Sequence, residues 1–176
     1  PEVVAELQRA GKAILVLTNG ATQSAANALA KYRTWGYAFE PRDVIASRDL
    51  LHSALKDWPV HLRWGFAAPE VAALHELPVR HISLELDPNS YDAADAFVFL
   101  STRAWSYEHQ ALLHEALVQR PRPLLVANPD IAAPREAGFS LEPGHFAHLL
   151  ADLPGVDARF YGKPFSNAFE EAFNRL

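Results

Sequence analysis

Cysteine and methionine are both absent from the 176 residues of this sequence. The absence of cysteine excludes disulfides, zinc–thiolate sites and a thiol nucleophile, and it fits a cytoplasmic protein. The absence of methionine is unusual, because a natural reading frame begins with one, whereas this chain begins at Pro1 in a segment with helical spacing of apolar residues. We therefore expect the chain to be a piece of a longer protein, or to have lost residues at its ends.

Basic clusters and long apolar runs are also absent. The formal net charge is −5, so nucleic acid is not an expected partner. No apolar stretch approaches the roughly 20 residues that span a bilayer. The first six residues carry acids instead of the apolar segment of a signal peptide. Neither a membrane nor a nucleic acid is therefore expected among the partners.

Several chemical motifs are missing as well. The sequence contains no G-x-x-x-x-G-K-[ST] loop, no G-x-G-x-x-G turn and no G-x-S-x-G elbow. His145 and His148 are three residues apart and would share a helix face, but no cysteine or clear third ligand accompanies them. Structural or surface roles are therefore expected for both histidines, and no metal site is expected within this chain.

What the sequence does contain is an alternation of apolar strands and helices. Hydrophobic residues make up 49% of the chain, which is enough for one domain or for two small lobes. Strands are predicted at 13–17, 44–46, 61–66, 81–86, 96–100, 123–127 and 158–161. Helices are predicted at 3–10, 21–35, 48–57, 69–74, 107–118, 144–153 and 166–176. The alternation predicts an α/β fold with a mostly parallel sheet covered on both faces. Five prolines between 121 and 143 indicate a lobe boundary or an ordered long loop.

Small polar residues follow the first predicted strand. Thr18 and Asn19 end an apolar run, and a helix is predicted to begin shortly after them. One interpretation is that the Thr18 hydroxyl only caps a helix or forms a turn. The other is that this hydroxyl and the backbone N–H of Asn19 bind phosphoryl oxygens, beside the positive end of the helix.

Two further strand ends carry groups of interest. Lys163 follows Gly162 after a short strand, and it is either a solvated loop lysine or a cation held against a phosphate. Asn128 and Asp130 flank Pro129 after another strand, where they form an ordinary turn or bring an amide and a carboxylate over a pocket mouth. Because ligands of α/β sheets bind at the carboxyl ends of strands, we expect Thr18 and Lys163 to converge on one anion site.

Several phrases at these strand ends occur in a recognisable order. They are Gly11-Lys12, Val16-Leu17-Thr18-Asn19, Val44-Ile45-Ala46-Ser47, Ala127-Asn128-Pro129-Asp130 and Gly162-Lys163-Pro164. In this order the chain resembles, over nearly its whole length, the class IIA haloacid-dehalogenase (HAD) phosphatases, a group that includes 4-nitrophenylphosphatase and related sugar-phosphate phosphatases.

The resemblance implies a Rossmann-like core of residues 1–47 and 139–176, with an α/β cap inserted at 48–138. It implies Mg²⁺-dependent hydrolysis of small phosphomonoesters through an aspartyl-phosphate. In this family pattern Thr18 binds the transferring phosphoryl group, Lys163 steadies the negative charge, and Asn128 and Asp130 have supporting roles. The cap would meet the leaving group, with Trp64, Trp105 and Arg103 as candidates for which core packing or solvation is the simpler interpretation. Caps in this family often take part in homodimer contacts.

The sequence departs from the family pattern in several places. The two aspartates of the first motif, which include the nucleophile, are missing, and so is the fourth motif, a Gly-Asp with a further Asp. His145 stands in a phrase that is glycine-rich in the family, and Gly20 replaces a commoner asparagine. We therefore expect the 176 residues alone to be inactive.

Two alternatives follow from these departures. One is a catalytically inactive HAD-like module that binds a phosphorylated ligand. The other is a flavodoxin-like or response-regulator-like domain, which also places a threonine and a lysine after strands. The long segment between Asn19 and Lys163 argues against this second alternative, because such a domain predicts a single short lobe.

Overall fold

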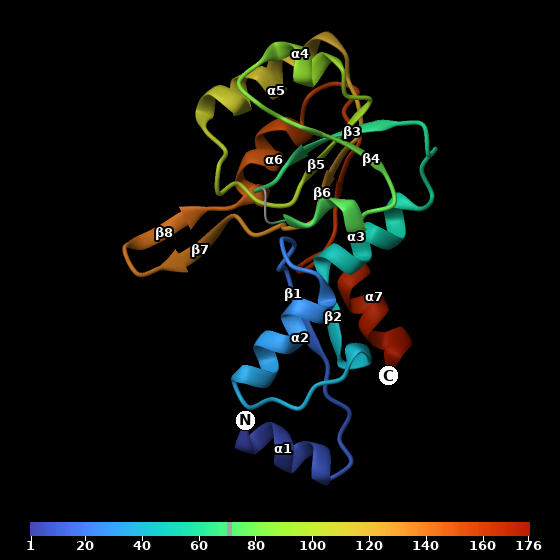
Figure 1. The fold of residues 1–176 in the computed structure, drawn as a ribbon, viewed down its shortest axis with the longest axis vertical. Coiled ribbons are helices and arrows are strands. Elements are labelled where there is room, and N and C mark those ends of the chain that lie inside the picture. The colour runs from blue at the N-terminus through green and yellow to red at the C-terminus, as the bar shows by residue number, and fades with distance from the viewer. Residues whose placement is uncertain (70–71) are drawn as a thin grey trace.

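Two lobes of unequal size lie along the long axis of the molecule in the computed structural model, which describes residues 1–69 and 72–176 (Figure 1). The smaller lobe contains both ends of the described chain. It consists of α1 (Glu2–Arg9), β1 (Val16–Thr18), α2 (Ala25–Thr34), the short helix η1 (Pro41–Asp43), β2 (Val44–Ala46) and the C-terminal α7 (Ser166–Arg175). All other helices and strands that the structure describes belong to the larger lobe.

The smaller lobe is built on two parallel strands. β1 pairs with β2 in the register Val16–Val44 and Thr18–Ala46. Leu29 and Phe39 are buried around this pair, and Tyr32 packs against Phe39 edge to face with ring centroids 5.7 Å apart. The side chain of Ser24 caps α2 by accepting a hydrogen bond from the backbone N–H of Asn27.

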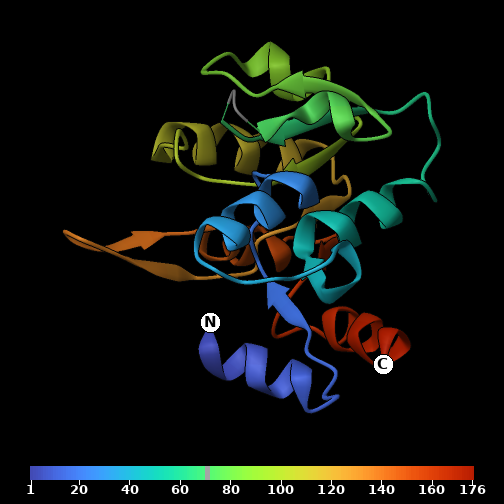
Figure 2. The ribbon, with the colours of Figure 1, turned by 60° about the horizontal axis from the view of Figure 1, so that its bottom comes forward.

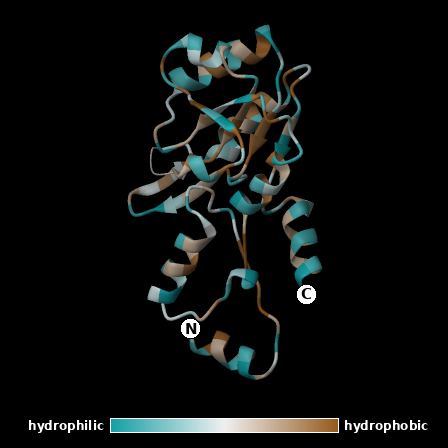
Figure 3. Cartoon of the chain, turned by 45° about the vertical axis from the view of Figure 1, so that its right-hand side comes forward, coloured by the Kyte–Doolittle hydropathy of each residue, from teal (hydrophilic) through white to brown (hydrophobic). Residues whose placement is uncertain are grey.

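A five-stranded parallel sheet forms the centre of the larger lobe. Its strand order is β4 (Arg80–Ser83), β3 (Arg63–Ala67), β5 (Ala96–Phe99), β6 (Leu124–Val126) and β9 (Ala158–Phe160). The strands β5 and β6 are buried at every residue, as expected for strands covered on both faces. Figure 3 shows hydrophobic residues concentrated in these strands. The predicted α/β fold with a mostly parallel sheet is confirmed.

Helices cover both faces of this sheet. One buried cluster combines residues of the sheet with α4 (Pro88–Asp92), α5 (Tyr107–Gln119) and α6 (Pro143–Ala151). The other contains Leu51 and Leu55 of α3 (Ser47–Leu55) together with Trp64, whose side chain is fully buried. The short helix η3 (Leu74–Glu76) lies in the connection between β3 and β4. No helix within the described residues is long and apolar enough to cross a membrane.

An antiparallel hairpin projects from the larger lobe, as Figures 1 and 2 show. It consists of β7 (Ala132–Arg135) and β8 (Gly138–Leu141), and Gly138 takes a φ of +123° at its turn. The sequence indicated only a lobe boundary or a long loop here, because its prolines argue against a strand. Pro134 is accommodated because this two-stranded ribbon has free edges on both sides.

The larger sheet extends past the boundary expected at residue 138. Residues beyond it contribute α6 and β9, and β9 pairs with β6 in the register Leu125–Arg159. Only α7 returns to the smaller lobe, where the guanidinium of Arg175 donates to the backbone oxygen of Val44 at 2.9 Å. The expected core segment 139–176 is therefore shared between the two lobes.

The elements otherwise lie close to their predicted positions. The helix predicted at 21–35 begins only at Ala25, because residues 19–24 form a loop and a cap. The helix predicted at 69–74 includes residues 70 and 71, which lie outside the described residues. The helix α4 was not predicted; it has five residues, starts with Pro88 and is capped by Asp87.

Candidate functional site

The side chain of Asn19 joins three chain segments at the boundary between the lobes. Its Nδ2 donates to Oδ1 of Asp130 and to the backbone oxygen of Lys163, both at 2.8 Å. Its Oδ1 accepts the backbone N–H of Lys163, also at 2.8 Å. Asn19 is buried, so these bonds replace water that the amide would otherwise bind. The end of β1 and the segment after β9 are thereby fixed to each other.

Gly162 allows this close approach. It has a φ of +119°, a conformation that side-chain-bearing residues rarely adopt. A Cβ at this position would lie 2.5 Å from Oδ1 of Asn19 and 3.0 Å from Cβ of Ser47. Ser47 begins α3, so the two places where the chain crosses between the lobes are in contact here.

Thr18 has the turn-forming role that the sequence suggested for it, and phosphoryl binding by its hydroxyl stays a prediction. Its Oγ1 accepts the backbone N–H of Gly20 at 3.1 Å, which is the turn-forming role. Among residues 1–69 and 72–176, no group accepts the proton of this hydroxyl. Thr18 also lines a cleft, so the hydroxyl can donate to a bound anion there.

The cleft has a volume of about 980 Å³ and lies between the lobes. Thr18 and Asn128 contribute to it from the ends of β1 and β6. One wall consists of the loop after β1 and of α2, and the other of the loop after β5 and of the hairpin. The walls include Lys31 and Tyr32 on α2, Trp35 directly after α2, Arg103 after β5, and Arg135 and Glu142 at the hairpin.

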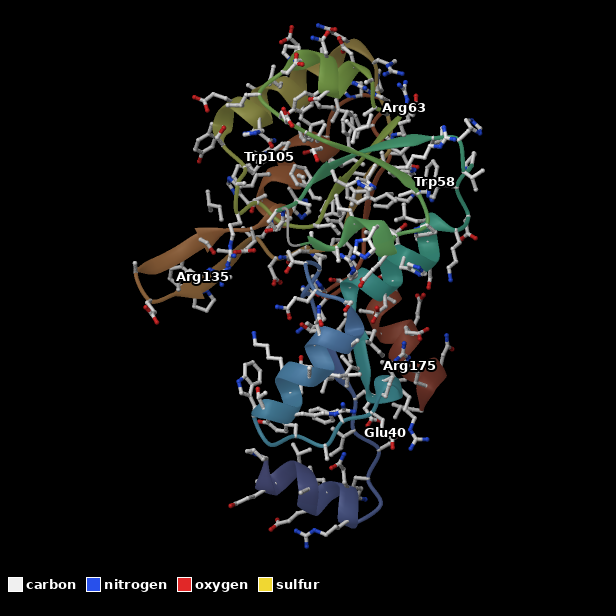
Figure 4. All side chains as sticks on the ribbon, in the orientation of Figure 1. Glu40, Trp58, Arg63, Trp105, Arg135 and Arg175 are labelled. Atoms are coloured by element: carbon white, nitrogen blue, oxygen red, sulfur yellow. The ribbon has the colours of Figure 1, made fainter. Side chains whose placement is uncertain are left out.

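A hydrogen-bonded chain runs along the hairpin wall. The guanidinium of Arg135 donates to Oε1 of Glu142 at 2.6 Å, and Nδ2 of Asn128 donates to Oε2 of the same carboxylate at 3.3 Å. Oδ1 of Asn128 in turn accepts the backbone N–H of Asp130 at 3.1 Å. Since Asp130 holds Asn19, the network connects the hairpin to the segment of Lys163. Figure 4 shows Arg135 on the hairpin.

A buried arginine fixes the other side of the loop after β1. Arg48 on α3 donates to the backbone oxygens of Ala21 at 3.1 Å and of Ala73 at 2.7 Å. Burial lowers the pKa of its guanidinium, and the carboxylate of Glu76 at 3.5 Å opposes that shift. Arg48 thus ties the loop that follows Thr18 to the connection between β3 and β4.

The predicted site residues are only partly brought together. Thr18 and Asn128 line the cleft, whereas Asn19 and Asp130 are not among its lining residues and bond to each other. Lys163 is placed by its backbone, but its exposed side chain is not among the residues that line the cleft. The convergence of its ammonium group with the Thr18 hydroxyl therefore stays a prediction.

The remaining candidates separate into core and wall residues. Trp64 is core, and Trp105 packs against Phe99 with ring centroids 5.1 Å apart, beside a smaller groove of about 310 Å³. Arg103 lines the cleft. His148 stacks on Phe160 with ring centroids 4.6 Å apart. Within the described part of the chain, no three His, Asp or Glu side chains are grouped closely enough to hold a metal ion.

Replacing Asn19 by aspartate tests the bracing role of its amide. The change removes both donated bonds and places a carboxylate beside Asp130, so we expect the free energy of unfolding to fall by about 3 kcal/mol at neutral pH. Repulsion raises the pKa of one carboxyl in the folded state above its unfolded value. The folded state then binds more protons, so stability is lost as pH rises and regained as pH falls. Urea unfolding at pH 7.5 and pH 5.5 measures this.

Asn19→Ala is the matched control for this prediction. It removes the same hydrogen bonds without adding a charge, so its loss of stability relative to the wild type should be the same at both pH values. If Asn19→Asp lost the same free energy of unfolding at both pH values, repulsion from the Asp130 carboxylate would not contribute to the loss.

Solved structures provide the comparison with known proteins. A variant of the thermostable p-nitrophenylphosphatase from Bacillus stearothermophilus matches with 26% identity and a TM-score of 0.71, covering 98% of this chain and 65% of that chain. A possible sugar phosphatase of the HAD superfamily from Cytophaga hutchinsonii matches with 18% identity and a TM-score of 0.81, covering 98% and 63%. A glycerol phosphate phosphatase from Mycobacterium tuberculosis, in complex with calcium, matches with 23% identity and a TM-score of 0.74, covering 98% and 50%.

The match extends over nearly all of this chain, which spans between half and two thirds of each of these three structures. No protein-family model and no curated protein matches the sequence.

Proposed function

Because this chain belongs by its fold to the HAD superfamily, we propose that the full-length protein hydrolyses small phosphomonoesters. The junction built on Asn19 is the observation that carries the proposal. It fixes the end of β1, which contains Thr18, against the segment that contains Lys163, although Asn19 and Lys163 are 144 positions apart. In this proposal the Thr18 hydroxyl and the backbone N–H of Asn19 bind the phosphoryl group, and Lys163 binds the charge that develops during transfer.

The proposed reaction passes through an aspartyl-phosphate, which splits the hydrolysis into two easier steps. The 176 residues contain no D-x-D pattern, so the nucleophile belongs to another part of the full-length protein. We also propose a divalent cation, with Mg²⁺ as the biological ion, but the described residues do not fit a metal site. This chain contributes positioning and electrostatic stabilisation.

We further propose the arrangement of a class IIA enzyme, in which the larger lobe is a cap over the smaller one. The pairing of β9 with β6 argues for a cap that extends from Ser47 to about Tyr161, beyond the limit of 138 expected from the sequence. A cap in this position meets the leaving group across the cleft and excludes water from it.

Phosphate release decides the proposal. The full-length protein with Mg²⁺ should release inorganic phosphate from 4-nitrophenyl phosphate, and the purified 176-residue chain should not. The proposal would be contradicted if the full-length protein binds phosphate or vanadate to saturation but releases no phosphate from the ester.

That contradictory outcome defines the second candidate function, a module that binds phosphorylated ligands without hydrolysing them. The absence of a D-x-D pattern from the sequence and of a metal-binding cluster from the described residues favours it. Calorimetric titration with inorganic phosphate separates the two functions, because the module binds phosphate while phosphate release from the ester stays at background.

A further inference from the structure

The charge of the cleft is opposite to the charge of the chain. The whole sequence has a net charge of −5, yet the cleft is lined by three cations, Lys31, Arg103 and Arg135, and by one carboxylate, that of Glu142. A cleft lined predominantly by one sign of charge attracts ligands of the opposite sign. Two of the three cations, Arg103 and Arg135, belong to the wall opposite α2.

Arg135 is oriented by hydrogen bonds, although more than half of its side chain is exposed. Its Nε donates to Oγ of Ser140 at 2.9 Å, and one Nη donates to Glu142 at 2.6 Å. A guanidinium has five N–H donors, so three remain that donate to no group among the described residues. The Glu142 carboxylate is nearly buried and is also bound by Asn128. These bonds orient the remaining donors of Arg135, which can form a paired contact with an anion.

The segment that carries Arg103 is attached to the same hairpin. The hydroxyl of Thr102 donates to the backbone oxygen of Leu141 at 3.0 Å, and Thr102 is buried. The two arginines are thus presented by segments that hydrogen bonds join to each other. Both lie on the wall opposite α2, whereas Thr18 contributes to the cleft from the end of β1.

We propose that the preferred substrate is a phosphomonoester whose leaving group carries a second anionic group, a carboxylate or a phosphate, and that Arg135 binds this group with help from Arg103. This inference rests on the proposed function and specifies its substrate class. The volume of about 980 Å³ exceeds what a phosphoryl group alone occupies, so the cleft has room for a leaving group that reaches the hairpin wall. Glu142 is a positioning residue, because it acts on the substrate only through Arg135.

The experiment compares two esters that differ by one anionic group, phenyl phosphate and 4-carboxyphenyl phosphate, with the full-length protein. We expect the wild type to have the higher kcat/KM for the carboxylated ester. Arg135→Gln should lower kcat/KM for that ester about 10- to 100-fold, mainly through KM, and by less than about 3-fold for phenyl phosphate. Arg103→Gln should act in the same direction and more weakly. The comparison of variant with wild type on each ester cancels the difference in leaving-group reactivity.

Two further variants make the result specific. Arg80→Gln removes an exposed cation of β4 that does not line the cleft, so it should leave the ratio of the two kcat/KM values unchanged. Glu142→Gln should raise KM for the carboxylated ester. In the double variant with Arg135→Gln, the loss of kcat/KM should be smaller than the two single losses combined.

Each outcome has a separate meaning. An equal loss on both esters in Arg135→Gln and in Arg103→Gln would overturn the inference while leaving the phosphatase function intact. Release of phosphate from neither ester by the wild type would overturn the proposed function, and the inference with it. Because Arg135→Gln leaves Glu142 without its cation, circular dichroism and urea unfolding should accompany the kinetics. Arg103→Gln is an independent test, because this substitution removes no partner of a buried group among the described residues.

Discussion

Replacing Lys163 by alanine in the full-length protein is expected to lower kcat about 10²-fold, the loss that follows removal of one charge-stabilising donor. The side chain is exposed, and its backbone N–H is what binds Asn19, so the substitution keeps the junction intact. The effect should therefore appear in kcat with little change in the free energy of unfolding. Steady-state release of phosphate from an aryl phosphate, together with urea unfolding, measures both quantities.

Two other substitutions control this experiment. Lys56→Ala removes an exposed lysine at the end of α3, away from the cleft, and should leave kcat unchanged. Lys163→Arg keeps the positive charge and should retain more activity than Lys163→Ala. Full activity of Lys163→Ala would refute the role of this lysine and would weaken the placement of the phosphoryl group beside Thr18.

Replacing Gly162 by alanine is expected to lower the free energy of unfolding by about 3 kcal/mol or more, and to abolish most of the activity. The φ of +119° strains any residue with a Cβ, by roughly 1–3 kcal/mol. In addition, the new Cβ would lie 2.5 Å from Oδ1 of Asn19, so the amide must move and its bond to the carboxylate of Asp130 is weakened. Urea unfolding and phosphate release measure the two effects.

Gly138→Ala is a closely matched control for Gly162→Ala. Gly138 has nearly the same φ, +123°, but nothing lies within 4 Å of the position that its Cβ would occupy. Its substitution therefore introduces the backbone strain without the collision. The difference in stability between the two variants isolates the contribution of the contact with Asn19. Equal losses in both variants would show that this contact matters little.

The sequence predicted the sheet and the strand ends well, because both depend on local patterns. Continuous apolar runs such as 96–99 are typical of buried parallel strands, and this is how they occur in the structure. The polar residues after β1 and β6 were also found, since they interrupt apolar runs at the point where a strand must end.

The role of the Asn19 side chain could not be predicted in this way. The sequence indicates a role for the backbone N–H of Asn19, whereas its side-chain amide braces residues that are 111 and 144 positions away. No local spacing indicates such partners. The same reason explains why the sequence did not indicate that the larger sheet continues past residue 138, because a three-residue strand such as β9 does not reveal which sheet it joins.

The cleft wall was predictable only in part. Arg103 was named as a candidate leaving-group contact, but Arg135 lies in a segment whose prolines concealed the hairpin. Its orientation depends on Glu142, seven residues later, and an ion pair across a hairpin becomes apparent only when the strand register is known.

The contact between Gly162 and Ser47 places the two interlobe connections side by side, which is where a rotation of one lobe against the other would have its axis. Displacement in a rigid-body rotation grows with distance from the axis. If the lobes turn about this point, the atoms around Asn19 move least, while the separation between α2 and the hairpin changes most. Entry and exit of a ligand through the cleft would then leave the proposed anion-binding end undisturbed and change only the distance to the opposite wall.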